Sequence, residues 1–271
     1  EFVQSMVLSL NSQDVVVQKI EWRAKGVVCD LFVLGTSYSV LGKIVRDILE
    51  DQPYDGIVQE LATRHKKLLI SDMDSTMITV ECIDELADFV GKKAEVSHIT
   101  ERAMNGELNF ESALTERVAL LEGMPEAVLQ ECYDERVKMM AGAKTLLDAF
   151  KKQGGYTVLV SGGFTFFTSR VRKELGYDAD FANELEIVEG KLTGTVKLPI
   201  LGKEAKLKTL QDTCQKMNIS PAEVLAIGDG ANDLPMLMAA GLGVAYHAKP
   251  IVRAQANAQL NHCDLSVLAG V

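Results

Sequence analysis

From residue 67 onward, short runs of leucine and β-branched residues alternate with longer segments whose apolar residues recur at helical spacing. The apolar runs predict strands at residues 68–72, 157–161, 179–183, 224–229 and 242–246. Strands that alternate with helices along the chain are typical of a parallel sheet with helices on both faces. The pattern therefore predicts an α/β fold built around a parallel sheet.

Glycines mark the ends of two predicted helices. The helices cover residues 143–153 and 165–175, and Gly154 and Gly176 follow them. Glycine is the residue that best tolerates the left-handed conformation after a helix. Residues 185–197, LEIVEGKLTGTVK, carry β-forming residues on both sides of a Glu-Gly pair and predict a hairpin.

The interval between the first two predicted strands, residues 77–141, contains only helical signals. Ile83, Leu86, Ala87 and Val90, for example, follow the spacing i, i+3, i+4, i+7. An all-helical insertion directly after the first strand lies where the carboxyl ends of parallel strands open. We therefore expect it to form a cap over a site at that edge of the sheet.

Residues 1–66 differ in character from the rest of the chain. Strand-like runs at 15–20 and 27–34, a helix at 39–50 and a further strand-like run at 57–61 indicate a small N-terminal α/β unit outside the main sheet. The first six residues, EFVQSM, are left out of this prediction. The order resembles part of an ACT-like regulatory fold, although about 60 residues are few for a complete one. Such a unit could sense an amino acid or join two copies in a homodimer.

The expected organisation is therefore this unit at 1–66, followed by an α/β domain at 67–271 whose helical cap lies at about 77–141.

The composition limits the classes of binding partner that the protein can have. The formal net charge is −10 and the pI is about 5.0, so the long-range field repels nucleic acid and anionic lipid. Any anionic ligand must be held by local cations or by a metal.

The cysteines suggest a reducing compartment. Five of them are widely spaced and form no C-x-x-C pair, which argues against a disulfide framework or a zinc site. No apolar stretch reaches the roughly 20 residues that span a bilayer, and the start lacks the order of a signal peptide. We expect a cytoplasmic protein with neither a nucleic-acid nor a membrane partner.

Polar residues cluster where the predicted strands end. Asp72 and Asp74, in SDMDST, end the first strand, and residues two apart in a strand point the same way. Two converging carboxylates suggest a hard cation or a shared proton. A strand end followed by a helix N-cap would explain them equally well.

The next strand ends in Ser161, Gly162 and Gly163 before an apolar helix. Free backbone N–H groups at a helix N-terminus, with the serine hydroxyl, could seat a phosphoryl group, but Ser-Gly-Gly is also common in plain loops. The sequence GDGAND at a later strand end supplies further oxygen ligands suited to Mg²⁺. Its side chains are Asp229, Asn232 and Asp233.

One lysine completes the set of candidate residues for a phosphoryl site. Lys206 in GKEAKLKTL gains meaning only because a cation must balance a phosphoryl group among three aspartates. The ordered motifs DMDST, Ser161, Lys206 and GDGAND closely resemble those of the haloacid dehalogenase superfamily of phosphotransferases. The resemblance covers about residues 67–268 and implies a Rossmann-like sheet that uses Mg²⁺.

Within that superfamily, VECIDELA and NGELNFESALTERV resemble the cap of the phosphoserine phosphatase family. From spacing alone, Arg117 would be a surface arginine and Glu81 a charge favourable near a helix N-terminus. The resemblance instead implies that Glu81 meets the substrate ammonium and Arg117 its carboxylate, while Met104 and Phe110 close over the site. The implied reaction is hydrolysis of O-phosphoserine, the last step of serine biosynthesis.

The mechanism that follows is a hypothesis. Asp72 attacks phosphorus to form an aspartyl-phosphate, and Asp74 protonates the leaving oxygen. Mg²⁺ is held by Asp72, the backbone carbonyl of Asp74 and Asp229. The phosphoryl oxygens meet Ser161, Gly162 and Lys206, and Asn232 and Asp233 position groups nearby. The alternatives are another superfamily phosphatase or phosphotransferase, acting on phosphothreonine, phosphohomoserine or a sugar phosphate, and a phosphoacceptor signalling domain.

Overall fold

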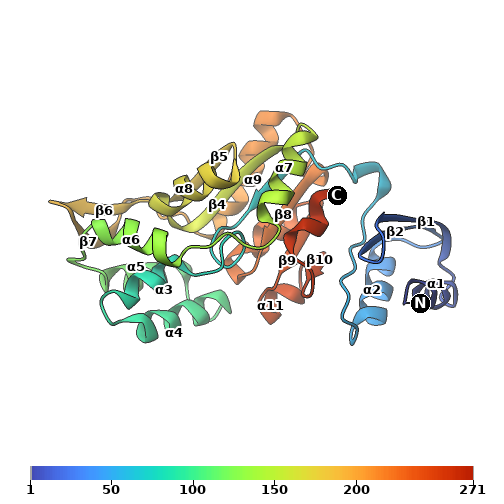
Figure 1. The fold of residues 1–271 in the computed structure, drawn as a ribbon, viewed down its shortest axis with the longest axis horizontal. Helices are drawn as coiled ribbons and strands as arrows, with labels where there is room; N and C mark the ends of the chain where they lie inside the picture. The colour runs from blue at the N-terminus through green and yellow to red at the C-terminus, as the bar shows by residue number, and fades with distance from the viewer. Residues whose placement is uncertain (1, 271) are drawn as a thin grey trace.

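A computed structural model describes residues 2–270 and has a six-stranded parallel sheet at its centre (Figure 1). The order across the sheet is β10-β9-β8-β3-β4-β5. The strands are β3 (Leu68–Ser71), β4 (Tyr156–Phe164), β5 (Ala179–Asn183), β8 (Val224–Gly228), β9 (Leu242–Tyr246) and β10 (Ala258–Leu260). The chain leaves β3 to build one half of the sheet through β4 and β5, and returns beside β3 with β8 to build the other.

The central strands β3 and β8 are buried at every position because both faces of the sheet are covered. Leu68 and Ile70 of β3 pack into one core, and Leu69, which points the opposite way, packs into the other. Two layers of helices bury these faces. The helices are α7 (Ala143–Lys152), α8 (Thr165–Leu175) and η4 (Leu265–Gly270) on the first core, and α9 (Lys203–Met217), α10 (Leu234–Ala239) and α11 (Pro250–Arg253) on the second.

The sequence prediction of the sheet is confirmed for all five strands, and one strand was missed. β4 continues three residues beyond the expected end, so it includes both glycines of the Ser-Gly-Gly motif. The missed strand, β10, has three residues and pairs only with β9. A run this short carries no recognisable periodicity.

The insertion after β3 is helical, as predicted. It contains α3 (Cys82–Asp88), α4 (Lys93–Met104), α5 (Phe110–Ala119) and α6 (Ala127–Arg136). Its two connections to the sheet run antiparallel to each other, with a bridge between Ile78 and Met139. The Met140 amide also donates to the Met77 carbonyl at 2.8 Å. The cap therefore joins the sheet at a single paired stem.

The predicted hairpin is also present. It consists of β6 (Leu185–Val188) and β7 (Lys191–Val196), and both residues of the connecting turn, Glu189 and Gly190, have positive φ angles of 50° and 72°. This conformation matches the twist of a tight hairpin. The Gly123 amide donates to the Leu192 carbonyl at 2.8 Å, which fastens the hairpin to the cap.

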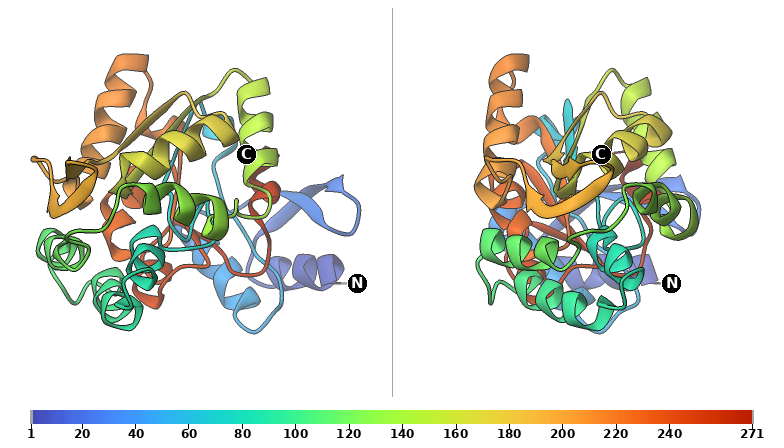
Figure 2. Two further views of the ribbon diagram at one scale, coloured as in Figure 1. Left: turned by 60° about the vertical axis from the view of Figure 1, so that its left-hand side comes forward. Right: turned by 90° about the vertical axis from the view of Figure 1, so that its left-hand side faces the viewer.

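The N-terminal elements have a core of their own. They are α1 (Phe2–Asn11), β1 (Val16–Ala24), β2 (Val28–Leu34) and α2 (Tyr38–Leu49), and Met6, Leu10, Val15 and Ile44 are buried among them. The helix α1 falls within residues left largely outside the sequence prediction. These elements lie on the far side of the main sheet from the cap (Figures 1 and 2).

The strand expected at residues 57–61 is wrong. Residues 57–60 belong to no helix or strand, and η1 (Leu61–Thr63) follows. The run is apolar because Ile57 packs against the core of the main domain, not because it pairs with β1 or β2. Just before it, the Asp55 carboxylate accepts hydrogen bonds from the amides of residues 261–263, at 2.8 to 2.9 Å.

None of the helices in residues 2–270 is long and apolar enough to cross a membrane.

Candidate active site

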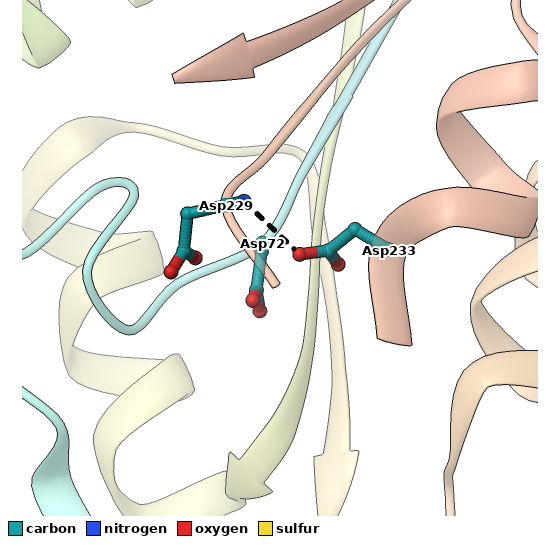
Figure 3. Close-up of side chains that lie close together, drawn as sticks. All are labelled: Asp72, Asp229 and Asp233. Atoms are coloured by element: carbon teal, nitrogen blue, oxygen red, sulfur yellow. Dashed lines mark hydrogen bonds between the residues drawn. The ribbon is translucent and has the colours of Figure 1, made fainter. Parts of the chain in front are cut away.

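Adjacent parallel strands bring the first acidic residues together. Ser71 of β3 is in register with Ile227 of β8, and the Asp72 amide donates to the Ile227 carbonyl at 3.0 Å. Asp72 and Asp229 follow these two strand ends, so their carboxylates emerge at the same edge of the sheet. Figure 3 shows these two side chains next to each other.

Asp233 completes a buried acidic cluster. Carboxylate oxygens of Asp72, Asp229 and Asp233 lie within 4.8 Å of one another. Asp233, however, is already engaged, since its Oδ2 accepts from the amides of Asp229 and Gly230, both at 3.1 Å. Figure 3 shows the bond from Asp229. It therefore shapes the GDGAND turn, which leaves Asp72 and Asp229 with the freer oxygens of the cluster.

Lys206 lies beneath this cluster and is fully buried. Its ammonium Nζ is 2.8 Å from Asp72 Oδ1 and 2.7 Å from Asp233 Oδ1. Burial alone lowers the pKa of Lys206, and the attraction of the two carboxylates outweighs it, so the net shift is upward and the ammonium stays charged. One cation thus faces three carboxylates.

This excess of negative charge bears on metal binding. Burial, with repulsion from Asp233, raises the pKa of Asp72 well above its usual range and that of Asp229 to about 7. A divalent cation would relieve this repulsion, and carboxylate oxygens are the donors that Mg²⁺ prefers. Asn232 adds a buried Oδ1 with no hydrogen-bond partner in the described residues. The residues present therefore fit a hard divalent cation.

Asp74 lies beside the cluster but in a different environment. Its Oδ1 accepts from the Cys82 amide at the start of α3 at 2.8 Å, and its Oδ2 accepts from the Ser161 hydroxyl at 3.1 Å. Burial raises the pKa of Asp74, although these hydrogen bonds oppose the shift. The two aspartates of SDMDST therefore differ: Asp72 contacts a lysine, whereas Asp74 contacts an amide and a hydroxyl.

Glycines let the cap approach the sheet closely. A Cβ on Gly162 would lie 2.4 Å from Cζ of Phe110, and one on Gly230 would lie 2.5 Å from Sδ of Met104. Both distances are too short for real carbon contacts. Because these glycines have no side chain, Phe110 and Met104 of the cap lie directly over the strand-end loops.

The cap side of the site carries one acid and one base. Glu81, at the N-terminus of α3, accepts a hydrogen bond from the Ser75 hydroxyl at 2.6 Å. Burial, with repulsion from Asp74 and Asp229, raises the pKa of Glu81 well above its usual range. Arg117 of α5 is 3% exposed and makes no salt bridge within the described residues.

A single cavity between the sheet and the cap joins most of the predicted site residues. Ten of them line it: Asp72, Asp74, Glu81, Met104, Phe110, Arg117, Ser161, Gly162, Gly163 and Asn232. Lys206, Asp229 and Asp233 do not line it and lie behind Asp72. Ile83, Leu114 and Phe164 also line the cavity and were not singled out as site residues. Ile83 belongs to an apolar helical stripe noted in the sequence, which could have indicated a wall but not that it faces a site.

Comparison with known proteins decides the family. Haloacid dehalogenase-like hydrolases match residues 69–238, which is more than half of the chain. The chain belongs to this family. The match begins within β3 and includes the cap, both strand-end aspartates and the GDGAND turn.

Named family members are similar over most of the chain. A phosphoserine phosphatase of Polaromonas is 51% identical over 207 residues, which cover 74% of this chain and 88% of that protein. Another, of Archaeoglobus fulgidus, is 45% identical over 80% of this chain, but the matched part is 63% of that longer protein. This chain thus spans less than two thirds of some of its relatives.

Solved structures of the family have the same fold. A haloacid dehalogenase-family hydrolase from Salmonella enterica serovar Typhi has a TM-score of 0.87 and 31% identity, covering 99% of this chain and 93% of its own. A phospho-aspartyl intermediate analogue of phosphoserine phosphatase has a TM-score of 0.71 and 38% identity, covering 74% of this chain and 96% of its own. The first match includes the N-terminal elements as well.

Proposed function

We propose that this family member is a phosphoserine phosphatase that hydrolyses O-phospho-L-serine to L-serine and phosphate. One observation carries the proposal: a single cavity contains strand-end carboxylates on one side and a glutamate and an arginine on the other. O-phosphoserine has a phosphate at one end and an ammonium and a carboxylate at the other, so it matches these groups in charge. The names of the relatives support the same assignment.

In the proposed mechanism, Asp72 is the nucleophile. Its Oδ1 already accepts from Lys206 and, at 2.7 Å, from the Met73 amide. Within the described residues Oδ2 has no hydrogen-bond partner, so Oδ2 is the oxygen available to attack phosphorus. The attack gives an aspartyl-phosphate and divides one difficult displacement into two easier ones.

Asp74 is the proposed general acid and base. Its raised pKa favours the protonated form that the departing serine oxygen requires. The Ser161 hydroxyl, which also accepts from the Gly163 amide at 2.8 Å, can donate to a carboxylate or accept from a carboxylic acid. It can therefore support Asp74 in both protonation states, before serine leaves and while water attacks.

Mg²⁺ would be held by Asp72, Asp229 and the backbone carbonyl of Asp74, and it would supply positive charge that offsets the repulsion between a carboxylate nucleophile and a phosphate dianion. The buried Lys206 holds Asp72 in place and adds further positive charge. The Gly162 N–H group and the Ser161 hydroxyl, which the Gly163 amide holds, would contact the phosphoryl oxygens near the start of α8.

The amino-acid end of the substrate would lie against the cap. Glu81 would meet the ammonium and Arg117 the carboxylate, with Met104 and Phe110 closing the cavity. Asn232 offers its unpaired Oδ1 to the substrate or to metal-bound water. A substrate that lacks either charged group would leave a buried cap residue unpaired, which is the physical basis of selectivity here.

The direct test is release of phosphate from a panel of phosphomonoesters, with and without a chelator. O-phosphoserine should give the highest kcat/KM, and the chelator should abolish turnover until Mg²⁺ is restored. Faster release from O-phosphothreonine, O-phosphohomoserine or a sugar phosphate would assign a different substrate to the same chemistry. Transfer of phosphate to an added alcohol, rather than to water, would instead identify a phosphotransferase.

We further propose that the protein is cytoplasmic, since all five cysteines are free.

We also propose that the N-terminal unit joins two copies of the chain in a homodimer. β1 and β2 pair only with each other, and β1 exposes Val16, Ile20 and Trp22. Exposed apolar strands of this kind tend to pair with a partner. Light scattering after size-exclusion chromatography should give a dimer that Trp22→Glu converts to a monomer. A monomeric wild type would contradict the proposal.

A further inference from the structure

The guanidinium of Arg117 is fixed by neighbours within the cap. Its Nε donates to the Ala113 carbonyl one turn earlier at 3.0 Å, and its Nη1 donates to the Thr100 hydroxyl at 2.9 Å. In residues 2–270, its Nη2 has no hydrogen-bond partner. Because Arg117 lines the cavity, this remaining nitrogen is the one available to a bound molecule.

The Thr100 hydroxyl is itself oriented by a carboxylate. It donates to Asp84 Oδ1 at 2.6 Å and lies 3.1 Å from the Val96 carbonyl. A hydroxyl has one proton, and the shorter bond to the charged acceptor is the stronger of the two. With its proton directed at Asp84, the Thr100 oxygen presents its lone pairs to Arg117.

The three residues come from three different helices. Asp84 lies on α3, Thr100 on α4 and Arg117 on α5. Thr100 is 4% exposed and Arg117 3%, so water is largely excluded and each polar group depends on its protein partner. The orientation of the guanidinium is therefore set by the packing of the cap helices.

The intervening hydroxyl has a chemical consequence. A direct arginine–carboxylate pair is often bidentate and occupies two guanidinium nitrogens. Here Asp84 acts on Arg117 through Thr100, and this link uses only Nη1. The negative charge of Asp84 still compensates the buried guanidinium, while Nη2 stays free for a ligand.

We propose that Thr100 and Asp84 are positioning residues that direct Nη2 of Arg117 at the substrate carboxylate, and so determine the preference for phosphomonoesters that carry a carboxylate. The inference rests on the proposed function, because it requires a substrate with that group. It assigns the selectivity to residues that do not line the cavity.

The test compares O-phosphoserine with O-phosphoethanolamine, which has the phosphate and the ammonium but no carboxylate. Thr100→Val keeps the shape of the side chain and removes the hydroxyl. We expect it to raise KM for O-phosphoserine about tenfold, the usual order for a lost hydrogen bond to a charged group, with kcat within about twofold. The kcat/KM for O-phosphoethanolamine should not change. Thr100→Ser should restore most of the loss.

Two controls separate positioning from general damage to the cap. Thr115→Val makes the same change at an exposed threonine of α5 whose hydroxyl, like that of Thr100, lies within about 3 Å of the carbonyl four residues earlier, and it should leave both substrates unaffected. In an Arg117→Ala background, Thr100→Val should add no further loss on O-phosphoserine, because its effect acts through the guanidinium.

Each remaining outcome decides the question. Equal losses on both substrates, or full additivity with Arg117→Ala, would overturn the positioning role. If Thr100→Val does not fold, Asp84→Ala should shift the same substrate ratio about threefold, and no shift would overturn the proposal. A wild type that hydrolyses both substrates equally would refute the proposed function itself, and with it this role. That failure appears in the wild type, before any variant is compared.

Discussion

The two sides of the cavity are built in different ways. On the sheet side, the charged groups bond to one another: Lys206 bridges Asp72 and Asp233, and the amides of the GDGAND turn bind Asp233. On the cap side, Glu81 and Arg117 make no salt bridge to each other and are held instead by the neutral hydroxyls of Ser75 and Thr100.

This difference matches the role proposed for each side. Groups that act on phosphorus must be fixed before the substrate arrives, since preorganised charge is most effective. Groups that recognise the two charges of an amino acid must keep part of their bonding capacity for the ligand. An ion pair between Glu81 and Arg117 would satisfy both residues without any substrate. We therefore expect changes on the sheet side to affect kcat and changes on the cap side to affect KM.

The largest expected effect is on the sheet side. Asp72→Asn removes the proposed nucleophile and should lower kcat for O-phosphoserine at least about a thousandfold, while Asp74→Asn should lower kcat by about a hundredfold to ten-thousandfold. Steady-state phosphate release measures both. Substrate affinity of Asp74→Asn, followed by calorimetry, should stay near wild type. If either variant kept its kcat, the role assigned to that aspartate would be wrong.

Arg117→Ala should produce the next largest effect. It removes a hydrogen bond between charged groups and should raise KM for O-phosphoserine about tenfold to a hundredfold, with a smaller change in kcat. The matched measurement uses O-phosphoethanolamine, on which the variant should behave like wild type. A fall in kcat alone would show that the two sides of the cavity do not divide the work as described.

The acid of the cap gives a pH dependence. Glu81 must be ionised to hold an ammonium, and burial raises its pKa above the usual range. As pH falls through this raised pKa, kcat/KM for O-phosphoserine should fall about tenfold per unit, since only the ionised fraction binds. Glu81→Gln should lower kcat/KM and remove this contribution from the profile. A wild-type profile retained in full by the variant would assign the titration to another group.

A smaller effect is expected where the two sides meet. Gly162→Ala places a Cβ 2.4 Å from Cζ of Phe110, so the ring must move away from the loop. Kinetic assays should show a loss of several-fold in kcat/KM, since overpacking typically costs about 1 to 3 kcal/mol and the far end of a half-buried ring can partly yield. Phe110→Leu should rescue the alanine variant. Without that rescue, the contact itself would not be the cause of the loss.

The smallest effect on activity is expected far from the cavity. Asp55→Ala removes the acceptor for three amides near the C-terminus and should lower the free energy of unfolding by about 1 to 3 kcal/mol. Thermal or denaturant unfolding measures this loss, and kinetic constants at 25 °C should match wild type. A change in substrate preference would indicate that the N-terminal unit influences the site.

The two sides also differ in how far the sequence revealed them. Asp72, Asp74 and Asp229 follow buried apolar runs, and a parallel sheet collects such strand ends at one edge, so their proximity could be deduced from the alternating pattern. The spacing of Glu81 and Arg117 by itself favoured ordinary positions on surface helices, and only resemblance to a family gave them roles. Thr100 carried no signal, because its partners lie 16 and 17 residues away on other helices.

The N-terminal residues show a different kind of error, in which the sequence predicted a strand that the structure does not have. The apolar run at 57–61 suggested a strand, but Ile57 packs on the main domain without a pairing partner and Leu61 is exposed. An apolar run indicates burial, and it does not say against what.

The sequence by itself determined the α/β architecture, the helical insertion and the acidic strand ends, because these follow from local periodicity and from the geometry of parallel strands. Only the tertiary structure decided which oxygens are free. Lys206 occupies one oxygen of Asp72, the GDGAND turn occupies Asp233, and Thr100 occupies one nitrogen of Arg117. These assignments depend on distances between side chains far apart in the chain, and no spacing along the sequence encodes them.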